Sequence, residues 1–393
     1  MSGPLTSLKV LDFSTLLPGP FGTMILADMG ADVIRVESLT RPDMVRMMLP
    51  QEHGVSAAHG YLNRSKKSLG LDLKKPGAVE LIKTLVKDHD IVVEQFRPGV
   101  MDRLGVGYEA LKAANPDVIY CSITGYGQTG PYKDRAGHDM NYLSIAGVMA
   151  YNGRKTTGPA PMGLQIADVA GGSYHGVMGI LAAVIHRQQG GGGQYIDVSM
   201  TDAAFSMQAL AAPAALGGGL PPELETTLLN GGSFYDCYET SDGRYFSVAG
   251  LEPQFFAQFC QAIGHPEWAS RGLVVVPEQV EALKNDIAQE IKSKTYQEWS
   301  DIFVVLDSCT EPVLSFEEAC RHPHIIAREL LVDVPAGEKQ VQRQMASPIK
   351  FSKTQQKYSR IGARLGEHTV EILKASGFSE IDIAALKEAG AIR

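Results

Sequence analysis

The sequence predicts an α/β protein with a large Rossmann-like parallel-sheet domain and a smaller α+β domain. Short β-branched runs alternate with helical patterns through the first 200 residues, which is typical of a parallel sheet built from β-α-β units. A Gly/Pro-rich break at 217–222 is followed by a hairpin pattern and then by helices, which indicates a second domain. The length of 393 residues also exceeds what one hydrophobic core usually organises.

The first β-α-β unit is expected over residues 8–37. Strands are predicted at 8–13 and 31–37, with a helix at 21–29 that Gly30 closes. The turn Pro18-Gly19-Pro20-Phe21-Gly22 lacks the glycine spacing GxGxxG, which lets a backbone approach a pyrophosphate. The sequence therefore disfavours an NAD enzyme despite its Rossmann-like rhythm.

The same alternation continues to residue 215. Further strands are expected at 68–73, 91–96, 118–123 and 194–198, and helices at 75–87, 108–114, 171–186 and 202–215. The polar stretch 38–66 predicts a loop or short helix on the ligand side. Its methionines Met44, Met47 and Met48 are more typical of core packing than of a ligand surface.

Three segments follow from this pattern. Residues 1–220 form the N-terminal part of the large α/β domain, and 221–330 form the small α+β domain, which opens with a hairpin over 234–249. Residues 331–393 show strand, loop and helix patterns again, so we expect them to return to the large domain.

Composition narrows the class of protein. Hydrophobic residues at 44% and charged residues at 20% exclude a disordered or fibrous protein, and a formal net charge of −8 gives no electrostatic reason to expect nucleic acid as a partner. The five cysteines are widely spaced without a CxxC pair, so we expect reduced thiols and no metal site. The N-terminus lacks a signal pattern, and the longest apolar run, near 177–185, is too short to span a bilayer. We therefore expect a cytoplasmic protein without a membrane partner.

An imidazole and a carboxylate stand side by side at His138 and Asp139. They follow a Gly/Pro-rich loop and precede an apolar run, so they are expected at a loop-to-helix junction. A lone histidine is by default a core residue with one satisfied nitrogen. Its place beside a carboxylate at an element boundary favours the alternative, a general base that works near neutral pH.

Two further carboxylates stand where helices are expected to begin. Asp168 precedes a long apolar helix, and N-capping alone would account for it. The helix dipole would also keep this carboxylate ionised, which suits either a base or a nucleophile. Glu252 precedes Pro253, and a proline at the first helical position is an adequate structural explanation. With His138, these groups would suffice for proton transfer on two faces of a substrate.

Arginines gather near the expected ends of strands. Arg97 and Arg103 surround a Pro-Gly turn, and Arg35 and Arg41 lie near the end of an earlier strand. Isolated surface arginines are usually solvated charges. Several arginines on neighbouring strand ends of an acidic protein would form a binding site for phosphates.

Seven motifs resemble those of the class III coenzyme A-transferase (CaiB/BaiF) superfamily. The resemblance runs from about residue 7 to 330 and continues as a family-like tail. The motifs are Gly30-Ala31-Asp32-Val33-Ile34-Arg35-Val36-Glu37, Asn63-Arg64-Ser65-Lys66-Lys67-Ser68, Phe96-Arg97-Pro98-Gly99, Thr124-Gly125-Tyr126-Gly127-Gln128-Thr129-Gly130-Pro131, Gly137-His138-Asp139-Met140-Asn141-Tyr142, Gly243-Arg244-Tyr245 and Leu251-Glu252-Pro253-Gln254-Phe255. Within the superfamily the chain is most similar to the α-methylacyl-CoA racemases, because the Gly-His-Asp-x-Asn-Tyr pattern is absent from the transferases.

The resemblance implies racemisation at C2 of 2-methylacyl-CoA thioesters through an enolate. His138, supported by Glu252, would serve one face of the substrate and Asp168 the other, while amides near Asp139 or Asp168 would hold the enolate oxygen. Two alternatives remain open. In a CoA-transferase, Asp168 would be a nucleophile that forms a mixed anhydride and then an aspartyl-CoA thioester. A non-catalytic relative would bind acyl-CoA without turnover.

The resemblance also implies how the substrate is held. The residues that it assigns to CoA binding are Arg103, Arg97, Arg41, Phe96 and Tyr142. Many relatives carry a basic residue where Ser38 stands, and Arg41 takes over that phosphate contact in this assignment. The resemblance further implies an interlocked homodimer in lipid metabolism, with acyl-CoA as substrate and no separate cofactor or metal. The acyl group itself stays open.

Overall fold

The computed structural model describes residues 3–393 and divides them into two compact units. Unit 1 contains the residues up to Ala146 together with Gly163–Met207 and His324–Arg393, and unit 2 contains Gly147–Met162 and Gln208–Pro323. The sequence placed the boundaries at 220 and 330. In the structure they lie at 207/208 and 323/324, and the segment Gly147–Met162, assigned to the large domain by the sequence, packs with unit 2.

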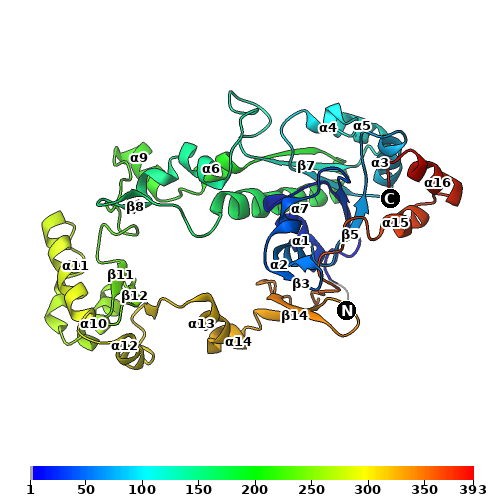
Figure 1. The fold of residues 1–393 in the computed structure, drawn as a ribbon. Helices are drawn as coiled ribbons and strands as arrows, with labels where there is room; N and C mark the ends of the chain where they lie inside the picture. The colour runs from blue at the N-terminus through cyan, green and yellow to red at the C-terminus, as the bar shows by residue number, and fades with distance from the viewer. Residues whose placement is uncertain (1–2) are drawn as a thin grey trace. The chain divides into compact units, whose positions relative to one another are not determined.

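A six-stranded parallel sheet forms the centre of unit 1 (Figure 1), which confirms the α/β class. The strand order is β10-β7-β6-β1-β2-β5. Most residues in these strands are buried, as expected where helices cover both faces of a parallel sheet. The strands are β1 (Lys9–Asp12), β2 (Asp32–Glu37), β5 (Lys67–Gly70), β6 (Ile91–Glu94), β7 (Ile119–Thr124) and β10 (Tyr195–Ser199).

The chain reverses its direction of travel across the sheet at β1. It passes from β1 outward to β2 and β5, and then returns to the other side of β1 with β6. In open parallel sheets, ligands bind beyond the carboxyl ends of the strands at such a reversal. The loops that follow β1 and β6 therefore lie where a binding site is expected.

Helices pack against this sheet in two groups. α1 packs on α7, and α7 also packs on β7 and β10. α3, α5, α15 and α16 contribute to one hydrophobic cluster with the strands, and Figure 1 shows α15 and α16 beside α3. His324–Arg393 belong to unit 1; the sequence predicted this return for residues 331–393. The helices of unit 1 are α1 (Pro18–Asp28), α2 (Ala57–Leu62), α3 (Ala78–Val86), α4 (Val100–Arg103), α5 (Tyr108–Ala114), α6 (Asp139–Ile145), α7 (His175–His186), α8 (Met200–Ser206), α14 (Pro323–Ala327), α15 (Thr369–Ala375) and α16 (Glu380–Glu388).

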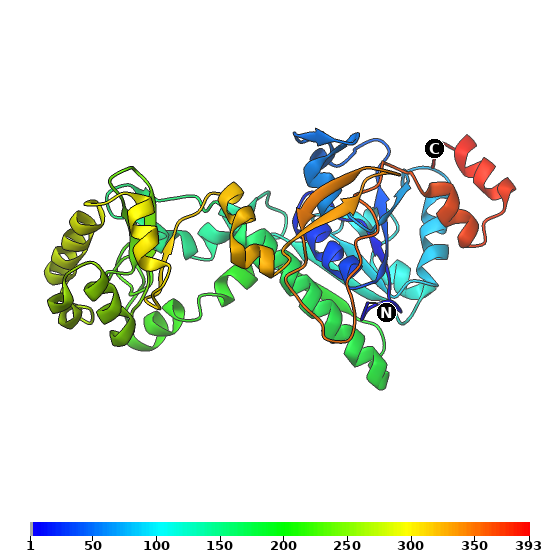
Figure 2. The same cartoon turned by 90° about the horizontal axis from the view of Figure 1, so that it is seen from below.

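Two small antiparallel hairpins complete unit 1. One consists of β3 (Gln51–Glu52) and β4 (Val55–Ser56), and the other of β14 (Leu331–Pro335) and β15 (Val341–Met345). Figure 2 shows the orange β14–β15 hairpin beside blue elements of the N-terminal part of unit 1, and α2 contacts β15.

The helix that includes α7 is longer than the sequence indicated. α7 continues π-helical segments on both sides, η3 (Ala167–Tyr174) and η4 (Arg187–Gly191), so the helical run spans 25 residues, Ala167–Gly191. By length and composition this run would suffice to cross a membrane, which the apolar stretch 177–185 alone would not. Within unit 1 it packs on α1, α8, β7 and β10, and 44% of its most apolar window is buried.

Two sequence predictions are wrong: the helix at 202–215 and the burial of three methionines. The helix predicted at 202–215 is two helices, α8 and α9 (Ala211–Gly218), because the chain passes from unit 1 to unit 2 between them. Hydrophobic periodicity cannot detect such a crossing. The three methionines expected in the core are exposed, at 63% for Met44, 66% for Met47 and 48% for Met48; they lie in or next to a short 3₁₀ helix, η1 (Met44–Met47).

Unit 2 is an α+β domain around a three-stranded antiparallel sheet, β11-β12-β13. The predicted hairpin is present as β11 (Asp236–Glu239) and β12 (Tyr245–Val248), and aromatic residues such as Trp299 and Phe256 fill the core. Arg154 ties the segment Gly147–Met162 to this unit through Asp236 and Glu225. The other elements of unit 2 are η2 (Val148–Tyr151), β8 (Gly153–Arg154), β9 (Gly158–Pro159), α10 (Pro253–Ala262), η5 (Pro266–Arg271), α11 (Pro277–Ile291), α12 (Tyr296–Phe303), β13 (Thr310–Pro312) and α13 (Phe316–Arg321).

Candidate active site

Two cavities open at the carboxyl edge of the unit 1 sheet. We call the first the Asp168 cavity; it has a volume of about 290 Å³ and is lined by residues that include Asp168, His138 and Tyr142. The second, the Arg103 cavity, has a volume of about 610 Å³ and is lined by residues that include Arg103 and Arg41. Thr15, Phe96 and Arg97 line both cavities. The two cavities therefore share a wall.

Asp168 lies in the first turn of the π-helical segment η3, and Ile166 occupies the N-cap position that the sequence gave to Asp168. Its backbone N–H donates to Oδ1 of Asp139 at 3.0 Å. Partial burial, and then the nearby charge of Asp139, raise the pKa of the Asp168 carboxyl to about 7. Asp168 is thus not held ionised by the helix dipole. At neutral pH it exchanges between acid and carboxylate.

His138 and Asp139 stand at the start of α6, at the loop-to-helix junction that the sequence predicted. The backbone N–H of His138 donates to Oδ1 of Asn141 at 3.0 Å, and the Asn141 N–H donates to the His138 carbonyl at 2.8 Å. The His138 side chain is exposed. His138 and Asn141 form a capping box at the start of α6, and His138 lines the Asp168 cavity.

Tyr142 holds the loop before α6 against the cavity. Its hydroxyl donates to the Gly137 carbonyl, and its ring meets that of Tyr126 edge-on, with 5.2 Å between the ring centres. Both tyrosines line the Asp168 cavity. Gly125 and Gly137 lie against the Tyr142 ring so closely that a Cβ on either would collide with it. These glycines in the motif are explained by packing.

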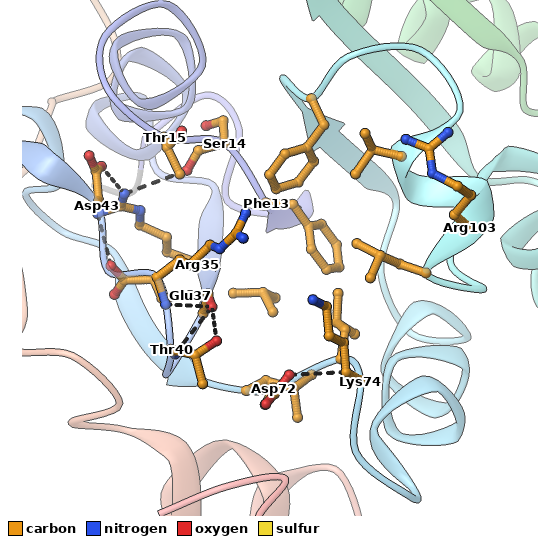
Figure 3. Close-up of a pocket in the computed structure, with 18 of the residues that line it drawn as sticks. Phe13, Ser14, Thr15, Arg35, Glu37, Thr40, Asp43, Asp72, Lys74 and Arg103 are labelled. Carbon is orange, nitrogen blue, oxygen red and sulfur yellow. Dashed lines mark hydrogen bonds and ion pairs between the residues drawn. The ribbon is translucent and has the colours of Figure 1, made fainter.

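Cationic side chains line the Arg103 cavity (Figure 3). Lys74 and Arg103 project from the wall opposite Arg35 and Asp43. Within the described part of unit 1, four cations of this cavity pair with no carboxylate: Arg41, Lys74, Arg97 and Arg103. Ser38 Oγ accepts from the Arg41 N–H at 3.1 Å, so the turn after β2 brings Arg41 to the cavity.

Arg35 does not contribute to this cationic set, contrary to what its place near a strand end indicated. It is 1% exposed and pairs with Glu37 at 3.2 Å and with Asp43. Burial opposes ionisation of Glu37, but Arg35 and Arg46 outweigh that effect and lower its pKa to about 2. The Asp43 carboxylate also accepts from the Leu16 N–H at 3.1 Å. The buried ions thus hold the loop between β1 and α1 in place.

A second buried pair supports the same loop. Asp12, the last residue of β1, is fully buried and pairs with Lys66 at 3.2 Å. Oδ1 of Asp12 accepts from the Ser14 N–H at 2.9 Å. Burial lowers the pKa of Lys66 to about 8 and opposes ionisation of Asp12, but Lys66 and Arg35 leave the pKa of Asp12 below its ordinary value.

The structure thus gathers most of the predicted site residues in unit 1. His138, Asp168, Tyr142, Phe96 and Arg97 line the Asp168 cavity, Arg41 and Arg103 line the other, and Asp139 contacts Asp168. Glu252 lies at the N-cap position of α10 in unit 2, with Pro253 at the first helical position. Its pairing with His138 stays a prediction.

Sequence reasoning missed several residues of the two cavities. Lys74 in the Arg103 cavity and Lys133, Arg135 and Gln95 in the Asp168 cavity were not singled out. Lys74 follows the end of β5, so the rule that drew attention to arginines after strand ends would have found it. The two cations on the loop before α6 carry no comparable signal, because loop charges are usually solvated.

Comparison with known proteins gives the same family as the motifs. The model of CoA-transferase family III matches residues 5–369. The chain is 34% identical to the α-methylacyl-CoA racemase of Mus musculus over 97% of this chain and 96% of that one, and 34% identical to the succinate–glutarate CoA-transferase of Agrobacterium fabrum over 94% and 95%. A CaiB/BaiF family protein from Brucella suis has a similar crystal structure, with a TM-score of 0.82, 30% identity and coverage of 96% and 100%. The resemblance drawn from the motifs is confirmed.

Replacement of Asp139 by asparagine should lower the pKa of Asp168. The amide keeps an oxygen for the Asp168 N–H but removes the negative charge that opposes ionisation, so the midpoint should fall below about 7 toward the ordinary value of an aspartate. The measurement is a ¹³C NMR titration of labelled aspartate carboxyls, with Asp168→Asn to assign the signal. Asp88→Asn, which removes an exposed carboxylate that lines neither cavity, is the control. An unchanged or higher midpoint in Asp139→Asn would show that Asp139 does not set this pKa.

Proposed function

We propose that this chain, which belongs to CoA-transferase family III, racemises or epimerises C2 of 2-methylacyl-CoA thioesters. The observation that carries the proposal is that His138 and Asp168 line one cavity, where the pKa of Asp168 is about 7. A hydrogen α to a thioester is weakly acidic, so its removal needs a base on one face and an acid on the other. A carboxyl group that titrates near neutral pH can serve in either role.

Each of the two proton-transfer groups acts on one face of the substrate. Asp168 takes the α-proton from one enantiomer or returns a proton to the enolate, and His138 does the same on the opposite face. The resemblance assigns to Glu252 the support of the imidazolium form of His138. The enolate oxygen needs a hydrogen-bond donor. The Asp168 amide donates to Asp139, so the amides of Asp139 and Met140 at the start of α6 are the candidate donors.

The Arg103 cavity is proposed to hold the nucleotide end of CoA. Its four unpaired cations, Arg41, Lys74, Arg97 and Arg103, suit a ligand with several phosphates. Arg97 and Phe96 line both cavities, so the pantetheine arm can run past them to the thioester. In this arrangement Arg41 takes the place of the basic residue that many relatives carry where Ser38 stands.

The names of similar proteins describe two reactions. The racemases of Mus musculus and Homo sapiens are 34% and 35% identical to the chain, while the succinate–glutarate CoA-transferase is 34% identical. The Gly-His-Asp pattern favours racemisation, because a transferase does not need the imidazole. The raised pKa of Asp168 favours it as well, because a nucleophilic carboxylate works best when it is fully ionised.

One observation favours the alternative, a CoA-transferase that works through an aspartyl-CoA thioester at Asp168. Lys133 and Arg135 line the Asp168 cavity, and a cation there could bind the carboxylate of an acceptor acid. Lys133 pairs with Asp134 at 3.0 Å, however, and the Arg135 guanidinium lies over the Tyr132 ring. Both cations already have partners, so racemisation remains the better supported reaction.

The wider setting follows from the same family assignment. We propose an interlocked homodimer in the cytoplasm, with acyl-CoA as substrate and with no metal or separate cofactor, because deprotonation next to a thioester needs none. The acyl group that the enzyme accepts is open.

His138→Ala and Asp168→Ala should each lower the racemisation rate by about 10²–10⁴-fold, the usual contribution of a positioned acid or base. Both variants should still bind CoA, because neither residue lines the Arg103 cavity. The measurement is chiral chromatography of a single enantiomer of a 2-methylacyl-CoA after incubation with each variant. The alternative would be established instead by two results together. The parent protein would not racemise the substrate, and His138→Ala would transfer CoA to free carboxylic acids with full activity.

Lys74→Ala should weaken the binding of coenzyme A by about tenfold, as expected for the loss of one phosphate contact. Lys75→Ala removes the same charge from the neighbouring residue, which does not line the cavity, and should leave binding unchanged. Calorimetric titration with coenzyme A and with pantetheine, which lacks the nucleotide, separates the two ends of the ligand. If Lys74→Ala weakened the binding of both ligands equally, Lys74 would not contact the nucleotide end of coenzyme A.

A further inference from the structure

Glu94, the last residue of β6, carries a buried carboxyl group that the proposed reaction does not use. The residue is 5% exposed. Oε2 accepts from the backbone N–H of Phe96 at 2.7 Å, and Oε1 accepts from the hydroxyl of Ser122 on the neighbouring strand β7. The first bond spans two residues and turns the chain immediately after the strand.

The turn fixed in this way is the wall that the two cavities share. Phe96 and Arg97 line both the Asp168 cavity and the Arg103 cavity. Next to Glu94, Gln95 accepts from the Gly19 N–H at the start of α1 with its side-chain oxygen, at 2.8 Å. The turn is therefore tied on one side to the sheet and on the other to α1.

Glu94 differs from the other buried carboxylates at this edge of the sheet. Asp12 and Glu37 pair with lysine or arginine, whereas in the described part of the chain no cation pairs with Glu94. Burial raises its pKa to about 7, and Asp102 and Asp197 act in the same direction. Burial of a carboxyl group without a cationic partner costs free energy, and hydrogen bonds to that group offset the cost.

We propose that Glu94 is a positioning residue for CoA thioesters, which holds the Phe96–Arg97 turn in the conformation that lets one ligand occupy both cavities. Glu94 does not touch the substrate. It acts through the Phe96 amide, and its effect is on binding rather than on proton transfer. The inference rests on the proposed function only in taking a CoA derivative as the ligand.

The test compares three variants by calorimetric titration with coenzyme A. Glu94→Ala removes the acceptor of the Phe96 N–H and should weaken binding by about tenfold, while Glu94→Gln keeps a neutral oxygen there and should bind within about twofold of the parent protein. Ser122→Ala leaves the Phe96 bond intact and should bind within about threefold. In racemisation assays Glu94→Ala should raise KM with kcat nearly unchanged, because the lost contact acts equally on ground state and transition state.

A purely structural role would give a different pattern. It would lower the thermal midpoint and the fraction of protein that binds, but would leave the Kd of the folded fraction unchanged in Glu94→Ala. That result, or binding by Glu94→Gln as weak as by Glu94→Ala, would overturn the inference, as would a parent protein that does not bind coenzyme A. Binding that follows the expected pattern in a protein without racemase activity would instead contradict the proposed reaction and leave the role of Glu94 standing.

Discussion

The site depends on how each strand of the parallel sheet ends. Asp12, Glu94 and Thr124, the last residues of β1, β6 and β7, each accept a backbone N–H two or three residues further on, at 2.7–3.1 Å. Such bonds turn the chain at a fixed angle after the strand. Because β1, β6 and β7 are adjacent and parallel, the three turns meet at one edge. The walls of the Asp168 cavity come largely from these turns.

Burial of the strand-end carboxylates determines the electrostatics of that edge. Around β1 and β2, Lys66, Arg35 and Arg46 pair with the buried acids and neutralise their charge. Around β6 and α6, burial raises the pKa of Glu94 and the pKa of Asp168 to about 7. The proposed proton transfer uses a carboxyl group that can gain and lose a proton near neutral pH. Burial and the charge of Asp139 raise the pKa of Asp168 into that range.

The sequence predicted the parts of this site that depend on local pattern. The strands and the loop-to-helix position of His138 follow from periodicity and turn residues. The predicted group of strand-end arginines holds for Arg97, Arg103 and Arg41, but not for Arg35, which pairs with Glu37 and Asp43. The pKa of Asp168 could not be predicted, because it depends on burial and on a hydrogen bond to Asp139, 29 residues away. The break between α8 and α9 and the assignment of 147–162 to unit 2 depend on contacts between distant segments, which no local pattern records.

The most direct test of racemisation is the fate of the α-hydrogen in the unmodified enzyme. A single enantiomer of a 2-methylacyl-CoA is incubated in deuterated water without any carboxylic acid acceptor, and α-deuterium is followed by mass spectrometry. Incorporation of one deuterium together with loss of chirality is the result that acid and base groups on two faces predict. Absence of exchange, with transfer of CoA once carboxylic acids are added, would contradict the account and make Asp168 the nucleophile of a transferase.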